Sequence, residues 1–369
     1  MNDELTTRSI VFDSDQPRRL ELHEFSLPAP ADGEAILRTE MAGICGADHH
    51  TYDGWFNRGR VVPGHEFVGR IVALGGDVQD ALGRPLAVGD RVVPDSTIPC
   101  RRCRYCRGVG SRSDKVIDYN ACEAFSLFGS IPIGDPPRVA GGWSEYVQIP
   151  RNALLHRVQE DTPLAAAVLL EPLAVAVKAV SKAGIAPGDT VVVQGPGPIG
   201  LLTVVAAQAA GATKTILVGP NPARLRAGEM LSANLTVNVR ETDPVAAVAE
   251  ATGGELAHRV IDASGATSAF QQGLDMTGRG GVYVNIGGFR PTDEVTFRPD
   301  RMKRFKIDIR FSHMGSNAYE PALAIIESGR FPLEKLVTHQ LPFEQAEEGL
   351  LILERRDGDP IKIALTFDG

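Results

Sequence analysis

Hydrophobic and polar positions follow two different patterns along this chain. Through the first ~155 residues, short apolar runs alternate with Gly, Pro and Asp, a pattern typical of strands in a β-rich domain. The clearest runs are EAILRTEMAGI (34–44), FVGRIVALGG (67–76), GDRVVP (89–94) and WSEYVQIP (143–150). We therefore expect this part of the chain to fold mainly as sheet.

The pattern changes near residue 161, where PLAAAVLLEPLAVAVKAVSKAG (163–184) predicts one long helix that ends at Gly184. Beyond it, continuous apolar runs typical of buried parallel strands alternate with helical patterns. This alternation predicts a doubly wound α/β domain, for which we expect the boundaries 158 and 299. The strand patterns are TVVVQ (190–194), KTILVG (214–219), RVIDAS (259–264) and GGVYVNIGG (280–288); helical patterns occur at 199–211, 319–329 and 344–356.

Composition and charge narrow the class of protein. The chain has 369 residues, of which 43% are hydrophobic and 23% charged, as expected for a globular protein of two domains. The net charge of −8 argues against a nucleic-acid partner, which requires a basic surface. No apolar run reaches the ~18 residues of a membrane span, and the polar segment MNDELTTRSIVFDSDQPRR lacks the apolar core of a signal peptide. We expect a cytoplasmic protein that acts on a small molecule.

The cysteines favour metal binding over disulfides. The chain has five cysteines, an odd number, and Cys100, Cys103 and Cys106 lie together in CRRCRYC. Closely spaced thiolates on a tight loop can converge on a zinc ion, which prefers four ligands. The fourth ligand is open: Asp114 is favoured, Cys122 is an alternative, and the loop can also lack a bound ion.

A dinucleotide-binding turn is predicted where the first strand of the α/β domain ends. In QGPGPIG, Gly195, Gly197 and Gly200 have the spacing G-x-G-x-x-G, with Pro198 and Ile199 opening the following helix. The first glycine permits the tight turn, the second lets the backbone approach a pyrophosphate, and the third allows close helix–strand packing. The helix N-terminus adds N–H groups that favour phosphate.

The next strand gives a weaker signal about the cofactor. NAD sites usually carry an acidic residue there for the ribose hydroxyls, but Gly219 holds that position here, followed by Asn221 and Arg224. A missing carboxylate removes repulsion against a 2′-phosphate, and an arginine can pair with that phosphate. We therefore favour NADP, with NAD as the alternative; Arg224 can equally be a solvated residue of the first helical turn.

Four further residues are informative only in combination. Cys45 in GICGADHH, His65 and Glu66 in PGHEF, and Glu171 in LLEPLAV are far apart in sequence, and each alone is a weak signal. These motifs are joined along the chain by CRRCRYC, GGWSEYVQIP and VQGPGPIG. The motifs and their order resemble those of the zinc-dependent medium-chain alcohol and polyol dehydrogenases, especially the sorbitol and threonine dehydrogenase branch. The resemblance covers nearly the whole chain.

This resemblance implies a fold, an activity and an assembly. The fold would combine a GroES-like β-rich catalytic domain (1–157 and 300–369) with a Rossmann cofactor domain (158–299). The activity would be interconversion of an alcohol, of secondary or polyol type, and its carbonyl by hydride transfer to or from NAD(P). The family also implies a homodimer or homotetramer.

The resemblance also implies roles for individual residues. Cys45 and His65 would be ligands of a catalytic zinc, with Glu66 a direct or exchangeable ligand and Glu171 a ligand or water-mediated partner. Asp48 would fix the His65 ring. Cys100, Cys103 and Cys106 match the structural zinc loop, and Asp114 falls on the position of its fourth cysteine. His50 matches the outer histidine of a proton relay.

Ala47 departs from the family pattern, because a Ser or Thr hydroxyl normally contacts the substrate oxygen there and relays its proton. Alanine has no donor or acceptor in its side chain. Three interpretations are open: water or the cofactor ribose bridges towards His50, a carboxylate such as Glu66 acts as base, or the site serves an unusual substrate. Two other functions are alternatives, a zinc-free quinone or enone reductase of the same superfamily and a non-enzymatic NADPH-binding protein.

Overall fold

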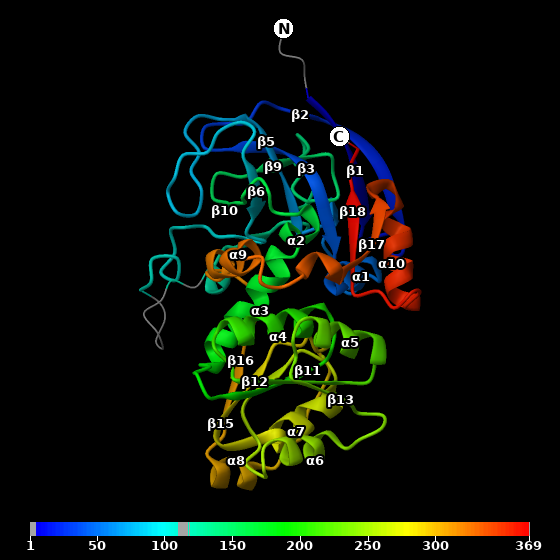
Figure 1. Cartoon of the computed structure of the whole chain (residues 1–369). Coiled ribbons are helices and arrows are strands. Elements are labelled where there is room, and N and C mark those ends of the chain that lie inside the picture. Colours follow the sequence, from blue (N-terminus) through cyan, green and yellow to red (C-terminus); the bar gives the residue numbers. More distant parts are fainter. Residues whose placement is uncertain (1–4, 110–116, 118, 369) are drawn as a thin grey trace. The chain divides into compact units, whose positions relative to one another are not determined.

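The computed structural model describes residues 5–109, 117 and 119–368, and the chain divides into two compact units (Figure 1). One unit comprises Met1–Glu171 and Leu333–Gly369, and the other comprises Pro172–Pro332. These limits differ from the expected limits at 158 and 299. The second unit begins later, at Pro172, and it ends later, at Pro332. Its later end has a structural reason, because strand β16 (Asp308–Phe311) joins its sheet and helix α9 (Tyr319–Glu327) packs on its helix α4 (Pro198–Ala209).

The first unit is built mainly from sheet, as the alternating pattern predicted. A seven-stranded sheet has the order β10-β6-β5-β3-β18-β17, with β9 also pairing with β3. Strand β18 comes from the C-terminal end of the chain, and its residue Ile363 lies opposite Ile44 of β3. The sheet comprises β3 (Ala35–Ile44), β5 (Phe67–Leu74), β6 (Arg91–Pro94), β9 (Tyr146–Ile149), β10 (Leu155–Arg157), β17 (Val337–Pro342) and β18 (Lys362–Thr366).

Smaller elements complete this unit. Its core contains the fully buried Trp143, Phe67 and Phe128, and the last two rings meet edge to face at 5.4 Å. The other elements are β1 (Leu5–Asp13), β2 (Leu20–Leu27), β4 (Arg60–Val61), β7 (Thr97–Ile98), β8 (Ser126–Leu127), η1 (Tyr119–Ala121), α1 (Gly46–Tyr52), α2 (Leu164–Ala167), η2 (Leu333–Leu336), η3 (Phe343–Gln345) and α10 (Ala346–Arg355).

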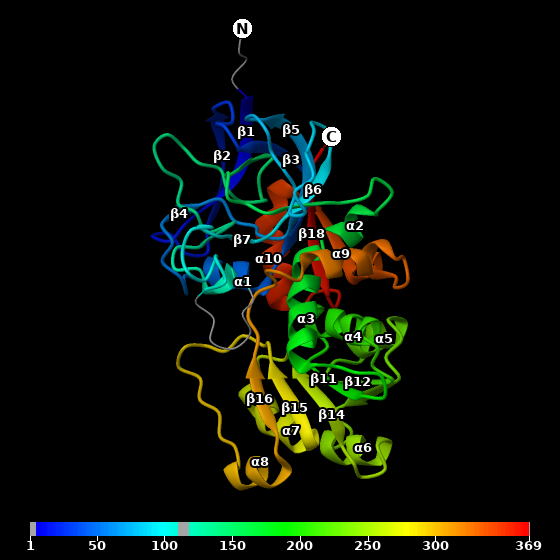
Figure 2. The ribbon, with the colours of Figure 1, turned by 90° about the vertical axis from the view of Figure 1, so that its left-hand side faces the viewer.

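The second unit is a doubly wound α/β domain. Its six strands are all parallel in the order β13-β12-β11-β14-β15-β16, and Figure 2 shows β14, β15 and β16 side by side. Helices α4 and α5 cover one face of the sheet, and α6 and α7 cover the other (Figure 1). The elements not yet given are β11 (Thr190–Gln194), β12 (Lys214–Gly219), α5 (Pro222–Met230), β13 (Leu235–Asn238), α6 (Pro244–Ala251), β14 (Ala257–Asp262), α7 (Thr267–Met276), β15 (Thr277–Asn285) and α8 (Pro299–Phe305).

The prediction of one long helix over 163–184 is wrong, because two helices occupy this segment. Helix α2 ends with Val168 as its C-cap, and α3 (Leu170–Ala183) begins two residues later. Pro172 explains the break, since proline has no N–H to donate to the carbonyl of Val168 and is tolerated only in a first helical turn. In the described part of the chain, no helix has the length and apolar character that crossing a membrane requires.

Candidate functional site

Cys45 lies where strand β3 ends and helix α1 begins. It occupies the N-cap position of α1 in an extended conformation, and its N–H donates to Oδ2 of Asp48 at 2.9 Å. The other carboxylate oxygen of Asp48 lies 3.4 Å from Nδ1 of His65. Asp48 is buried, at 8% exposure, and its one carboxylate fixes both the turn that presents the thiol and the imidazole ring.

Three ligand atoms converge beside this carboxylate. One atom each from Cys45, His65 and Glu66 lies within 4.8 Å of the other two, although Cys45 is distant from the other two in sequence. Burial alone lowers the pKa of His65, but the charge and hydrogen bond of Asp48, together with the Cys45 thiol, raise that pKa well above its usual value. A thiol, an imidazole and a carboxylate in one cluster suit a zinc ion.

Glu66 is also paired with a lysine that sequence reasoning did not identify. Lys362 Nζ lies 2.6 Å from Oε2 and 2.8 Å from Oε1 of Glu66, and 3.3 Å from the carbonyl oxygen of Ile44. The pairing of β18 with β3 brings this lysine to the site. The only sequence signal was a lysine at the start of the apolar strand KIALT.

Gly43 makes room for this pair. A Cβ atom at Gly43 would lie 2.2 Å from Oε2 of Glu66, far inside van der Waals contact. The backbone of Gly43 also donates to the carbonyl oxygen of Glu66 at 2.7 Å. A side chain at this position would therefore displace the carboxylate.

Glu171, a further predicted ligand, lies beside this cluster but not within its 4.8 Å set. Its Oε1 accepts from the hydroxyl of Ser96 at 3.1 Å, and it is 6% exposed. Burial raises the pKa of Glu171 to about 7, and the neighbouring charge of Glu66 acts in the same direction. A buried carboxyl group therefore adjoins the three ligand atoms.

Helix α1 carries the predicted relay position. Ala47 is exposed in the first turn, and its carbonyl accepts from the hydroxyl of Thr51 at 3.0 Å. His50 stacks on Trp55 with ring centroids 4.0 Å apart. His49, which had no assigned role, has Nδ1 3.2 Å from Oδ2 of Asp53.

A second cluster of possible metal ligands consists of four cysteine thiols. Cys100, Cys103, Cys106 and Cys122 place their sulfur atoms within 4.8 Å of one another. The alternative set with Cys122 is therefore the set that the structure brings together. Asp114, the favoured fourth ligand, lies outside the described residues, so its expected role stays a prediction.

The cysteine cluster has the electrostatics of a metal site. Burial raises the pKa of Cys106 to about 12, whereas backbone N–H groups, that of Cys106 first, lower the pKa of Cys103 to about 6. Cys122 Sγ accepts from the backbone N–H of Cys100 at 3.2 Å. Four crowded thiolates repel one another, so a cation is needed for all of them to ionise together.

The glycine-rich turn has the geometry expected of a phosphate cradle. Gly195 has a φ of +90°, and its N–H donates to Val218 at 2.9 Å. A Cβ atom at Gly200 would lie 1.8 Å from the carbonyl oxygen of Gly195, so this helix can approach the strand only with glycine there. Gly197 is the N-cap of α4 and faces open space, with Pro198 in the first turn. Its backbone is therefore accessible to a ligand.

The neighbouring strand end carries the other predicted cofactor residues. Gly219 is the last residue of β12, and Asn221 is the N-cap of α5, where its side chain accepts from the N–H of Arg224 at 3.1 Å. Arg224 is half-buried, whereas Arg226 on the same helix is exposed.

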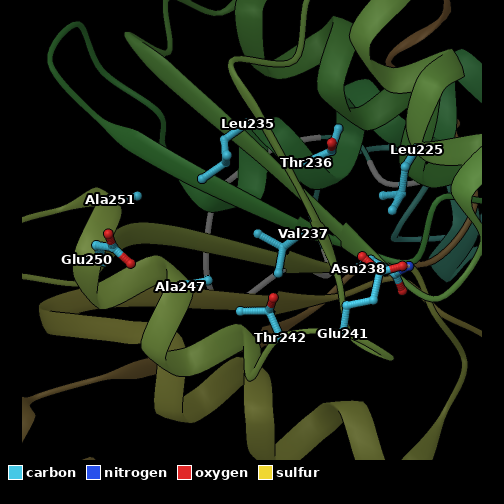
Figure 3. A pocket seen from close by; sticks show the side chains of 10 residues that line it. All are labelled: Leu225, Leu235, Thr236, Val237, Asn238, Glu241, Thr242, Ala247, Glu250 and Ala251. Carbon is cyan, nitrogen blue, oxygen red and sulfur yellow. The ribbon is translucent and has the colours of Figure 1, made fainter.

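A pocket of about 640 Å³ lies at the free edge of the parallel sheet (Figure 3). Strand β13, the loop after it and helices α5 and α6 supply its walls. It contains none of the predicted metal or cofactor residues. Its lining residues are Leu225, Leu235, Thr236, Val237, Asn238, Glu241, Thr242, Ala247, Glu250 and Ala251.

Comparisons with known proteins agree with this geometry. Residues 31–160 match the family model of the alcohol dehydrogenase GroES-like domain, and residues 198–328 match that of the zinc-binding dehydrogenases. An erythritol/L-threitol dehydrogenase of Mycolicibacterium smegmatis is 35% identical over 347 residues, which are 90% of this chain and 91% of the relative. A sorbitol dehydrogenase of Halalkalibacterium halodurans is 31% identical, over 92% of this chain and 93% of the relative.

Solved structures show the same similarity. An alcohol dehydrogenase from Thermotoga maritima has a TM-score of 0.90 and 27% sequence identity, over 98% of this chain and 99% of the other. A 2R,3R-butanediol dehydrogenase from Bacillus subtilis has a TM-score of 0.82 and 25% sequence identity, over 98% of this chain and 100% of the other.

Proposed function

Because this chain belongs to the zinc-binding medium-chain dehydrogenases, enzymes that act on CH–OH groups with NAD(P), we propose that it interconverts a polyol and its ketose. The observation that carries the proposal is the convergence of Cys45, His65 and Glu66. Several similar proteins act on polyols by name, including the erythritol/L-threitol and sorbitol dehydrogenases and a D-xylulose reductase of Aspergillus oryzae. The substrate would be a secondary hydroxyl group of a short sugar alcohol.

The donor set fits a catalytic zinc ion, with Cys45, His65 and Glu66 as the residues that would hold it. Zinc, when bound, acts as a Lewis acid that lowers the pKa of a hydroxyl group. The contact of His65 Nδ1 with Asp48 would fix the ring and leave Nε2 as the nitrogen available to the ion. Lys362 neutralises part of the Glu66 charge and holds its carboxylate in place.

Glu171 would contact the zinc ion through a water molecule, not directly. It lies outside the tight three-atom set, and Ser96 binds one of its oxygens. In the metal-free protein, burial raises the pKa of this carboxyl group to about 7, so it can hold a proton beside the ligand cluster. We assign it the role of a neighbouring acid or base.

The proton of the substrate hydroxyl has to leave without a side-chain hydroxyl at position 47. Ala47 cannot accept or pass it. We assign this step to water or to the cofactor ribose, with His50 as the outer acceptor. The stacking of His50 on Trp55 holds the imidazole ring in place.

The cofactor would be NADP, bound at the turn of Gly195, Gly197 and Gly200. The open space at Gly197 supports backbone contact with a pyrophosphate. The position usually occupied by an acidic residue is Gly219, and the N-terminus of α5, with Asn221 and Arg224, would face a 2′-phosphate.

Matched arginine variants test this cofactor assignment. Arg224→Gln should weaken NADPH binding roughly tenfold and leave NADH binding nearly unchanged, since one charged hydrogen bond is lost. Arg226→Gln, two residues away on the exposed side, is the control. Equal effects of both variants, or equal loss of both cofactors, would contradict a 2′-phosphate contact.

A second zinc ion would be held by Cys100, Cys103, Cys106 and Cys122. Such a Cys₄ site stabilises a loop and takes no part in the reaction. We also propose a homo-oligomer, dimer or tetramer, which light scattering of the purified protein can test.

The function itself is tested with the metal-containing protein and a panel of substrates. NADP- and NAD-linked oxidation of erythritol, threitol, sorbitol and xylitol should exceed that of ethanol, and chelation should abolish it. Cys45→Ala and His65→Ala should lose both turnover and one zinc equivalent. Zinc-free reduction of quinones or enones would indicate the reductase alternative, and NADPH binding without any turnover would indicate a binding protein.

A further inference from the structure

The ring of Pro196 occupies the space into which a side chain at residue 219 would extend. A Cβ atom at Gly219 would lie 2.1 Å from Cδ and 2.6 Å from Cγ of Pro196. Gly219 does not belong to the glycines with positive φ, so its backbone conformation is open to any L-residue. The three atoms nearest to that Cβ position all belong to Pro196, so its ring requires glycine there.

Pro196 cannot easily move away from Gly219. It is buried in the turn that follows β11, and the N–H of the preceding Gly195 donates to Val218, the residue before Gly219. Gly195 itself is closely packed, since a Cβ atom on it would lie 2.6 Å from Cα of Ser264. The turn is thus held from both sides, and the ring stays against the end of β12.

We propose that Pro196 is a cofactor-selecting residue, because it prevents a carboxylate at position 219. An acidic residue at this strand end binds the ribose hydroxyls of NAD and repels a 2′-phosphate. Its exclusion leaves the position neutral and favours the phosphorylated cofactor. This inference rests on the proposed function of the turn as an NADP site and names the residue that enforces the preference.

Removal of the Pro196 ring should allow a side chain at residue 219. Without Cγ and Cδ, the next atom of Pro196 is its backbone nitrogen, 3.4 Å from the Cβ position of residue 219, an ordinary contact distance. Pro196→Ala should therefore make room for a side chain at 219. Pro198, the other proline of the turn, is not among the atoms nearest to that position and is a matched control.

The steric clash between Pro196 and a side chain at residue 219 is tested by measuring the melting temperature of variants without any cofactor. Gly219→Ala should lower the melting temperature by about 3–10 °C, the scale of overpacking in a close-packed region. Adding Pro196→Ala should recover most of this loss, whereas adding Pro198→Ala should not. A Gly219→Ala protein as stable as the parent, or equal recovery by both prolines, would overturn the proposal.

The selectivity part is tested by equilibrium binding of NADPH and NADH, followed by fluorescence titration. The Pro196→Ala/Gly219→Asp protein should shift the ratio of the two dissociation constants by roughly tenfold or more towards NADH. Pro196→Ala alone should leave the ratio within about threefold of the parent, because it adds no charge. An unchanged ratio in a folded double variant would refute cofactor selection at this position.

The two proposals fail in different ways. If the parent protein binds NADH as tightly as NADPH, the proposed NADP preference is wrong, while the recovery of stability by Pro196→Ala still decides whether the ring excludes a side chain. If the parent prefers NADPH and Pro196→Ala gives no recovery, only the role of Pro196 is wrong.

Discussion

Lys362 Nζ lies 2.6 Å from Oε2 of Glu66, and the exposed fractions of the two side chains are only 3% and 2%. This ion pair joins the last strand of the chain to the metal-ligand cluster. Buried pairs contribute little net stability compared with apolar residues, but removal of one partner leaves an uncompensated buried charge. The pair therefore holds Glu66 in place at a cost that the surrounding sheet has to offset.

A double-mutant cycle tests this pairing. Lys362→Met and Glu66→Gln should each lower the free energy of unfolding, Lys362→Met by about 3–5 kcal/mol, because its partner stays charged. The double variant should lose less than the sum of the two. Urea unfolding in the presence of a chelator gives these values without a metal contribution. Additive losses would show that the two side chains do not interact.

Glu171 should make the metal-free protein less stable as the pH rises. Its pKa is about 7 in the folded protein, whereas the ordinary pKa of a glutamate side chain is 4.5. The folded state therefore binds more protons than the unfolded state between these values, and stability falls with increasing pH. Between about pH 5 and pH 8 the parent should lose roughly 3 kcal/mol more than Glu171→Gln. Parallel stability curves for the two proteins would contradict the raised pKa.

The fourth ligand of the cysteine cluster can be identified by metal analysis. Cys122→Ser should reduce the zinc content by about one ion per chain and lower the melting temperature, because a structural site needs four ligands. Asp114→Asn is the matched variant for the alternative ligand and should keep its zinc. The reverse result would assign the fourth position to Asp114.

Ala47 offers a direct test of proton transfer. Ala47→Thr introduces the missing hydroxyl, and Ala47→Val introduces the same volume without it. If proton release limits turnover, Ala47→Thr should raise kcat for polyol oxidation by about tenfold, towards the lower end of acid–base effects. Ala47→Val should lower kcat or leave it unchanged. Similar kcat values for the two variants would mean that water already transfers the proton efficiently.

Much of the fold could be predicted from local patterns. The alternating runs over 34–44 and 67–76 became β3 and β5, and the continuous run TVVVQ became β11. These predictions succeed because the side-chain period of a strand or helix is a local property of the chain. The helix over 163–184 was mispredicted because apolar periodicity outweighed Pro172, which divides the segment into α2 and α3.

The candidate site was predictable only in part. Cys45, His65 and Glu66 stood out through the order of their motifs, and their convergence was then found in the structure. Lys362 was missed because nothing near it in sequence indicates a carboxylate partner 296 residues away. Cys122 was undervalued because it lies 22 residues from Cys100, outside the compact cysteine motif.

The sequence by itself determined the principal strands of the two sheets, the glycine spacing of the turn and the chemical types of the ligands, but not the division of 163–184 into α2 and α3. Only the tertiary structure decided which distant side chains meet: Lys362 with Glu66, Cys122 with the other three thiols, and the ring of Pro196 with Gly219. The reason is physical. Periodicity and turn chemistry act over a few neighbouring residues, whereas burial and strand pairing bring together residues whose separation along the chain carries no signal.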